Sequence, residues 1–324
     1  MYCKILLATV ANRLKAQFPL PDRVTAPAKA QIVIPVHNRR ETTHACLERL
    51  NQLGVPTWAG VIVVDDGSTD GTAEMIQAEH PWVQRLHGHG QLWWTGAIDL
   101  GMREAIRNGA ECIVWLNDDV LPDAGALELL VEEALMNQSV CGAVCRGGNE
   151  IPVAYAGGVM RNLWPHPVRH IQGTAPAPVE WLHGNLVAIP AVVWRRCGLP
   201  EARHMPHNLA DISYTLDAHR AGIPVRLLPG ATALATPNDT ASYWSWTDPR
   251  IRPWNLLSGL WNVKMWWYMP GVAWFQAHHS GWRAVPVLAF LILKLLLWIL
   301  LKSLLPARAL KQLNTIIGCK SARQ

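Results

Sequence analysis

Two adjacent carboxylates, Asp118 and Asp119, follow Asn117 at the end of an apolar run, CIVWL, at residues 112–116. Such a run is typical of a buried strand, yet like charges side by side repel each other and each resists burial. In one interpretation the strand leaves the core here, and Asp123 caps the helix that follows. In the other, a cation neutralises the carboxylates. The triplet alone leaves both interpretations open.

Similar polar clusters follow two earlier predicted strands. The strand at 31–36 leads into HNRR at 37–40, and the strand at 60–64 leads into DDGSTD at 65–70. Helical patterns separate the strands, which predicts right-handed βαβ units and a parallel sheet covered on both faces. Ligands bind such sheets beyond the carboxyl ends of the strands. We therefore expect the three clusters to converge, which favours the cation.

The composition indicates a reduced, globular protein with a distinct tail. Half of the 324 residues are hydrophobic, and the seven cysteines are odd in number with no Cys-x-x-Cys spacing. This pattern favours free thiols in the cytosol over a disulfide framework. The N-terminal residues 1–30 show no clear cleavage site, so we expect an amphipathic helix there rather than a signal peptide.

Charge is distributed unevenly along the chain. After Asp248 there are ten Lys or Arg residues and no acidic ones, so the preceding part has 29 − 10 = 19 basic against 24 acidic residues. An acidic globular part thus joins a basic tail that contains many of the 17 Trp residues. The asymmetry predicts an anionic membrane surface as a partner. We expect no nucleic-acid partner.

Two common nucleotide-binding motifs are absent from the sequence. There is no G-x-G-x-x-G after the first strand, which argues against a dinucleotide site, and no G-x-x-x-x-G-K-[ST]. Carboxylates at two strand ends have another use. One cluster can accept hydrogen bonds from a base or ribose, and the other can hold a divalent cation that bridges to phosphates. This combination suits a nucleotide-diphosphate substrate.

Four motifs in this order carry a resemblance: VIPVHNRRE, VVDDGSTDGT, LWWTGAIDLGM and VWLNDDVLP. Together they resemble family-2 glycosyltransferases of the GT-A fold, over about residues 31–230. The chain is most similar to the rhamnosyltransferase-like, non-processive branch, and it lacks the Gln-x-x-Arg-Trp motif of processive synthases. The resemblance implies a Rossmann-like, mostly parallel α/β sheet with helices on both faces.

The resemblance also implies roles for individual residues. Asp119 and Asp118 match the metal triplet for Mg or Mn, and Asp211 matches the catalytic base. The segment His183, Gly184 and Asn185 matches the acceptor side. The residues matched to nucleotide or donor contacts are Pro35, His37, Arg39, Asp65, Asp66, Trp94, Thr95, Gly96 and Asp118.

The sequence departs from the family pattern at several of these positions. Asn117 stands where the first metal-site Asp is expected, and Ala210 replaces a Glu before Asp211. No His follows the last strand, so Asn238 or Asp239 is the candidate for a third metal ligand. Simpler interpretations stay open: Asp211 also fits a helix N-cap, Asp65, Asp66 and Asp70 also fit a turn, and Trp93 and Trp94 also fit a core.

The implied activity is an inverting, metal-dependent transfer of a hexosyl or deoxyhexosyl group from a nucleotide-diphospho-sugar to a lipid-linked or surface-glycan acceptor. One base deprotonates the acceptor hydroxyl, and the metal stabilises the departing diphosphate. Two rivals are a sugar-phosphate nucleotidyltransferase, which normally opens with a Gly-rich loop that HNRRE lacks, and a membrane-bound nucleotide-sugar binding protein without turnover.

The run VPVLAFLILKLLLWILLKSLL at 285–305 is just long enough to cross a bilayer. Lys294 in its middle is costly at that depth, and Lys294, Trp298 and Lys302 recur every four residues. We expect helices in the membrane plane at the cytoplasmic face of the inner (plasma) membrane, with a single span and an oligomerisation helix as alternatives. The expected parts are an extension (1–30), the glycosyltransferase domain (31–245) and the membrane-associating helices (246–324).

Overall fold

The computed structural model describes residues 29–147, 156–167, 175–236, 252–306 and 309–310. Three predictions fall outside these residues: the N-terminal amphipathic helix, the boundary near residue 245, and Asn238 or Asp239 as a third metal ligand.

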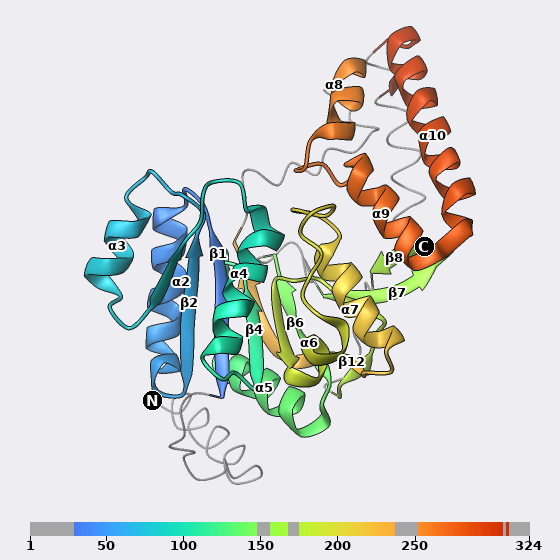
Figure 1. Ribbon diagram of the computed structural model, residues 1–324. Coiled ribbons are helices and arrows are strands. Elements are labelled where there is room, and N and C mark those ends of the chain that lie inside the picture. The colour runs from blue at the N-terminus through green and yellow to red at the C-terminus, as the bar shows by residue number, and fades with distance from the viewer. Residues whose placement is uncertain (1–28, 148–155, 168–174, 237–251, 307–308, 311–324) are drawn as a thin grey trace, which may run out of the picture.

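The described residues form a mixed, mostly parallel sheet of nine strands in the order β3-β2-β1-β4-β11-β6-β12-β5, with β9 paired to β12 (Figure 1). Strands β1, β2, β3 and β4 run parallel, whereas β11 runs antiparallel to β4 and β6. The bounds are β1 Ala30–Val36, β2 Ala59–Asp65, β3 Gln84–His87, β4 Cys112–Leu116, β5 Val120–Pro122, β6 Val140–Arg146, β9 Ala177–Pro178, β11 Leu186–Pro190 and β12 Val225–Ala235.

Helices cover both faces of this sheet, as the alternation of strands and helices predicts. In β1, Ile32 and Ile34 belong to one hydrophobic core and Val33 to the other, because successive strand side chains point to opposite faces. The first core packs against α2 (Arg40–Gln52), α3 (Thr72–Glu79) and α5 (Ala126–Asn137). The second packs against α4 (Trp93–Arg107), α6 (Ala191–Cys197) and α7 (Ala210–Arg220).

The chain order places two strand ends next to each other at a switch point. The chain leaves β1 toward β2 and β3, then returns to β4 on the other side of β1. The loops after β1 and β4 therefore flank the crevice in which open α/β sheets bind ligands. Helix α4 lies close against β1 because Gly101 has no side chain: a Cβ there would lie 2.3 Å from Val33 Cγ1.

The proposed cap at Asp123 is wrong. Helix α5 begins at Ala126 after Gly125, and no side chain caps it. The Asp123 carboxylate instead accepts hydrogen bonds from Thr232 Oγ1 and Arg146 Nη2, so it ties the β5–α5 connection to β12 and β6.

A small sheet and a group of helices complete the described structure (Figure 1). The small sheet has the order β10-β7-β8. We call residues 252–310 the C-terminal helical unit. The bounds are β7 Gly157–Arg161, β8 Trp164–Pro167, β10 Trp181–Leu182, α8 Pro253–Ser258, the 3-10 turns Gly259–Trp261 and Gly281–Arg283, α9 Met269–Ser280 and α10 Ala284–Leu304.

Helix α9 is fixed to α7 by a polar junction beside an apolar cluster. His279 Nε2 lies 2.7 Å from Ser213 Oγ, Arg220 Nη1 donates to His279 Nδ1 at 2.9 Å, and His278 Nε2 lies 2.9 Å from Asp217 Oδ1. The ligand atoms of Asp217, His278 and His279 are close enough to hold a metal ion. However, Ser213 and Arg220 already contact both nitrogens of His279, so the junction is complete without an ion.

Residues Met269–Leu304 are long and apolar enough by composition to cross a membrane. They do not form one straight rod, because Gly281 has a φ of 55° and separates α9 from α10. Since α9 packs against α7, α10 is the element free to meet a membrane.

Acidification is expected to loosen the α7–α9 junction. Burial, together with the charges of Arg220 and His278, lowers the pKa of His279 from 6.5 to about 3. Between these pH values the unfolded chain binds a proton that the folded protein does not, so stability falls as the pH falls below about 6.5. At pH 4.5 this amounts to about 2–3 kcal/mol. His279→Gln should flatten the pH dependence of the unfolding free energy, measured by denaturant titration.

His219→Gln is the matched control, because His219 lies exposed near the end of α7, the helix that His279 of α9 contacts. If His279→Gln retains the full pH dependence of the wild-type protein, the junction does not cause it.

Candidate functional site

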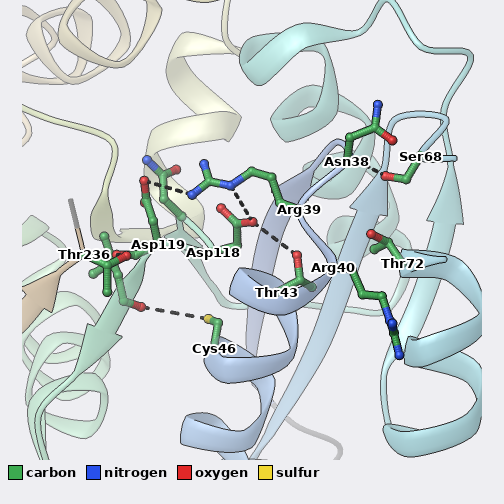
Figure 2. A network of polar contacts seen from close by, with 12 residues as sticks. Asn38, Arg39, Arg40, Thr43, Cys46, Ser68, Thr72, Asp118, Asp119 and Thr236 are labelled. Carbon is green, nitrogen blue, oxygen red and sulfur yellow. Dashed lines mark hydrogen bonds and ion pairs between the residues drawn. The ribbon is translucent and has the colours of Figure 1, made fainter. Parts of the chain in front are cut away.

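The carboxylate pair after β4 faces an arginine from the end of β1 (Figure 2). Arg39 Nε lies 3.3 Å from Asp118 Oδ2, and Arg39 Nη2 lies 3.4 Å from Asp119 Oδ2. Thr43 Oγ1, in the first turns of α2, donates to Asp118 Oδ2 at 3.2 Å. Loops that are 80 residues apart in sequence thus meet at the switch point, as the strand pattern predicts.

The pair remains short of positive charge even with Arg39 in place. The Asp118 side chain is only 3% exposed. Burial and, to a smaller extent, the charge of Asp119 raise the pKa of Asp118 to about 7, although Arg39 opposes the rise. Two carboxylates with oxygen donors fit a hard divalent cation such as Mg²⁺ or Mn²⁺, which would displace the proton that Asp118 otherwise binds near neutral pH.

The end of β12 fixes the backbone of this loop. Thr236 donates to the Asp119 carbonyl oxygen from its N–H at 2.8 Å and from its Oγ1 at 3.1 Å (Figure 2). The residue after β12 therefore holds the Asp119 backbone, and Arg39 after β1 contacts its side chain.

The acidic pair after β2 is buried and held by the surrounding chain. Asp65 accepts hydrogen bonds from Ser68 N and Arg85 Nη1. Asp66 accepts from the backbone N–H groups of Gly90, Leu92 and Trp93 at 2.7, 2.8 and 3.2 Å. In the described structure Asp66 therefore positions the start of α4.

His37 joins the ends of β1 and β2. Its Nδ1–H donates to the Asp66 carbonyl oxygen at 2.6 Å, while its ring remains exposed. Asp70 has the turn role that the sequence left open, because it accepts from Thr72 N and Arg40 N.

The start of α4 contributes an indole wall, and Asn117 orients it. Trp94 Nε1 donates to Asn117 Oδ1 at 2.8 Å, and the Trp94 ring meets Trp115 edge-on with centroids 5.4 Å apart. In the sequence, Asn117 stands out only as a departure from the expected metal triplet. In the structure its amide oxygen accepts the hydrogen bond from Trp94, and no pattern in the sequence predicted this contact.

Asp211 lies in the first turn of α7 and does not cap it, since Leu209 occupies the N-cap position. Asp211 Oδ2 accepts a hydrogen bond from Gly184 N at 2.7 Å, and Oδ1 accepts none from the described residues. A Cβ at Gly184 would lie 2.6 Å from the Trp94 ring and 2.9 Å from Asp211 Cβ. Glycine is thus required for Asp211 and Trp94 to share this site.

The neighbours of Gly184 belong to the same edge of the sheet. Burial lowers the pKa of His183, with Asp211 opposing, so His183 stays neutral beside the carboxylate. Asn117 N donates to the Asn185 carbonyl oxygen at 3.0 Å, which joins the acceptor-side segment to the carboxylate loop.

Three of the residues predicted to contact the nucleotide-sugar donor do not present polar side chains to the site. Thr95 is fully buried, and its hydroxyl donates to the Met205 carbonyl oxygen at 2.7 Å. Pro35 is half-buried within β1, and Gly96 is half-buried in the first turn of α4. Thr95 instead fastens the loop that leads into Asp211, which we call loop 203–209.

The site forms one contiguous series of contacts along the carboxyl ends of the strands. It runs from Arg39 and the Asp118–Asp119 pair, through Asn117 and Trp94, to Gly184 and Asp211. One end fits a cation and the phosphates it would bind. The other presents a carboxylate oxygen that can accept a proton from a hydroxyl.

Comparisons with known proteins bear on the family and the fold. Residues 31–171 match the family described as Glycosyl transferase family 2. The uncharacterized glycosyltransferase YfnE of Bacillus subtilis (strain 168) is 31% identical over 120 residues, 35% of this chain and 29% of that protein. The match thus spans less than a third of that relative's length.

Two solved structures share the fold. GalNAc-T7, determined with UDP, GalNAc and Mn²⁺, has a TM-score of 0.55 and 14% identity, covering 80% of this chain and 52% of that one. The mannosyltransferase PcManGT of Pyrobaculum calidifontis, with GDP-Man and Mn²⁺, has a TM-score of 0.51 and 15% identity, covering 95% and 94%. The family match, the glycosyltransferase relatives and the mixed α/β architecture together support a family-2 glycosyltransferase with the Rossmann-like GT-A fold.

Proposed function

We propose that the protein is an inverting, metal-dependent glycosyltransferase that transfers one sugar from a nucleotide-diphospho-sugar to a lipid-linked or surface-glycan acceptor at the cytoplasmic face of the membrane. The main observation is the series of contacts that joins the Asp118–Asp119 pair to Asp211 across Trp94. In this proposal the two ends of that series would hold a cation and supply a base.

On the donor side, Asp118 and Asp119 would hold the divalent cation. When bound, the cation stabilises the negative charge that develops on the departing diphosphate. Arg39, which lies against both carboxylates, would provide a second positive charge. The structures of GalNAc-T7 and PcManGT were both determined with a nucleotide and Mn²⁺, which supports this assignment.

On the acceptor side, Asp211 would remove the proton of the attacking hydroxyl. Gly184 N fixes one carboxylate oxygen, so the other oxygen points to substrate in a defined direction. Transfer of a hexose or deoxyhexose by a rhamnosyltransferase-like, non-processive enzyme fits the sequence motifs.

The membrane assignment rests on the exposed side of α10. Its large exposed hydrophobic residues are Val285, Phe290, Ile292, Leu293, Leu296, Leu297, Leu300 and Leu304. At 100° per residue they fall within an arc of roughly 160°. The opposite side, with Leu295, Trp298 and Lys302, is buried within the C-terminal helical unit. A helix with lipid on one side and protein on the other fits the membrane plane.

Asp119→Ala should abolish the effect of metal on donor affinity, because it removes one of two carboxylate ligands. We expect wild-type protein to bind a nucleoside diphosphate from a panel more tightly with Mn²⁺ than with chelator, measured by calorimetry. Asp123→Ala, which removes a carboxylate of the same loop region outside the site, is the control. Mn²⁺-dependent binding that survives in Asp119→Ala would place the metal elsewhere.

Asp211→Asn should lower turnover by about 10²-fold or more, the usual contribution of a general base, and leave nucleotide binding intact. The amide keeps an acceptor for Gly184 N but cannot take a proton. Steady-state transfer rates and nucleotide affinity are measured side by side, with Asp99→Asn on the surface of α4 as control. Turnover near the wild-type rate would reject Asp211 as the base.

Leu293→Glu with Leu297→Glu should release protein from membranes into a carbonate wash, because charges would replace two leucines of the lipid-facing arc. Met136→Glu is the matched control, since Met136 is an 80% exposed hydrophobic residue of α5 in the catalytic domain. A C-terminal tag should be accessible to protease on the cytoplasmic side. A tag protected on the far side would instead establish a span.

A further inference from the structure

One rim of the site is built from three distant segments that hydrogen bond to one another. Thr95 N donates to the Pro206 carbonyl oxygen at 2.9 Å, which ties α4 to loop 203–209. Asn208 Nδ2 donates to the Val263 carbonyl oxygen at 2.9 Å, which ties that loop to the C-terminal helical unit. The unit therefore supplies part of the wall that leads to Asp211.

Lys264 follows Val263 directly and reaches the Trp93 ring at the start of α4. A turn holds its backbone, since Met265 N donates to the Asn262 carbonyl oxygen and Lys264 N donates to Asn262 Oδ1 at 3.0 Å. The ammonium lies 5.8 Å from the centre of the Trp93 ring, within the range of a cation–π contact.

Trp93 is presented at this rim by its backbone. Its φ of 56° is rare for an aromatic residue, and its N–H is fixed to Asp66 Oδ2 at 3.2 Å. The ring is 36% exposed and meets His207 at 5.9 Å between centroids. The Asp66 carboxylate, which positions the start of α4, thus also fixes the backbone of Trp93, whose ring contacts Lys264.

Lys264 and Asp211 both affect the pKa of His207. Burial lowers the pKa of His207, Lys264 lowers it further, and Asp211 opposes. His207 therefore stays neutral, and its ring meets the same Trp93 ring that Lys264 contacts. Lys264 thus lies against the residue that precedes Trp94, whose ring borders Gly184 beside Asp211.

The Lys264 ammonium forms no ion pair with an acidic side chain among the described residues, and the sequence has no acidic residue after Asp248. It is exposed, and Trp261, three residues earlier, is 72% exposed in the same unit as the apolar arc of α10. The C-terminal helical unit therefore offers both exposed apolar side chains and an exposed ammonium that contacts the start of α4.

We propose that Lys264 binds a phosphate group of an amphiphilic acceptor, so that the acceptor is a lipid-linked glycan anchored through phosphate rather than a neutral surface glycan. The inference rests on the proposed function and specifies its acceptor. Charge-assisted hydrogen bonds from an ammonium to phosphate oxygens are strong, and they would hold the acceptor lipid at the rim while its sugar hydroxyl reaches Asp211.

The test uses dodecyl phosphate in micelles of a non-ionic detergent, with binding to full-length protein measured by calorimetry. Lys264→Ala should weaken binding about tenfold or more, as expected for loss of a hydrogen bond between charged groups. Lys264→Arg should restore most of it. Arg283→Ala is the matched control, because Arg283 is another basic residue of the C-terminal helical unit that lies over an indole, 5.9 Å from the centre of the Trp282 ring. This variant should change the affinity for dodecyl phosphate less than twofold.

Two further arms separate the sources of phosphate. On phosphatidylglycerol vesicles, Lys264→Ala and Arg283→Ala should weaken binding by the same small factor, as surface charges do. Nucleoside diphosphate affinity with Mn²⁺ should be unchanged in Lys264→Ala.

If Lys264→Ala and Arg283→Ala weaken the affinity for dodecyl phosphate equally, Lys264 acts only as a general surface charge and the proposal is overturned. Loss of nucleoside diphosphate binding in Lys264→Ala would also overturn it, because it would place the lysine on the donor. Absence of Mn²⁺-dependent nucleotide binding in the wild-type protein would contradict the proposed function itself.

Discussion

The site depends on the contact between Arg39 and the two aspartates at the end of β4. Two buried carboxylates next to each other are unfavourable without positive charge, and the loop after β1 supplies one guanidinium for both. This requires β1 and β4 to be neighbours, which the chain achieves by building β2 and β3 outward before it returns. The strand order is thus what brings a compensating guanidinium to a costly pair of charges.

Much of the fold can be predicted from the sequence because its strands are short apolar runs followed by polar loops. The expected strand at 112–116 coincides with β4, and the expected strands at 31–36 and 60–64 fall within β1 and β2. The convergence of the clusters at one sheet edge follows from parallel pairing alone. The break at Gly281 was not predicted, because apolar periodicity continues on both sides of it.

The side-chain partnerships within the site were harder to predict. Asp66 was expected to contact the donor, yet its oxygens accept backbone N–H groups from a loop more than 20 residues away. Asn117 bonds to Trp94, and Asp123 bonds to Thr232 instead of capping α5. Each of these contacts joins segments far apart in the chain, and local patterns carry no information about such pairs.

The way α9 is attached to α7 means that the two parts of the protein are not interchangeable modules. Phe275 of α9 is fully buried among Met205, Ala210 and Leu216, which belong to loop 203–209 and α7. A truncated fragment without the C-terminal helical unit would expose this apolar patch on the helix that carries Asp211. A fragment made for solubility would therefore expose apolar surface beside Asp211 and lose the contacts that hold α7, so the two parts would have to be expressed as one piece.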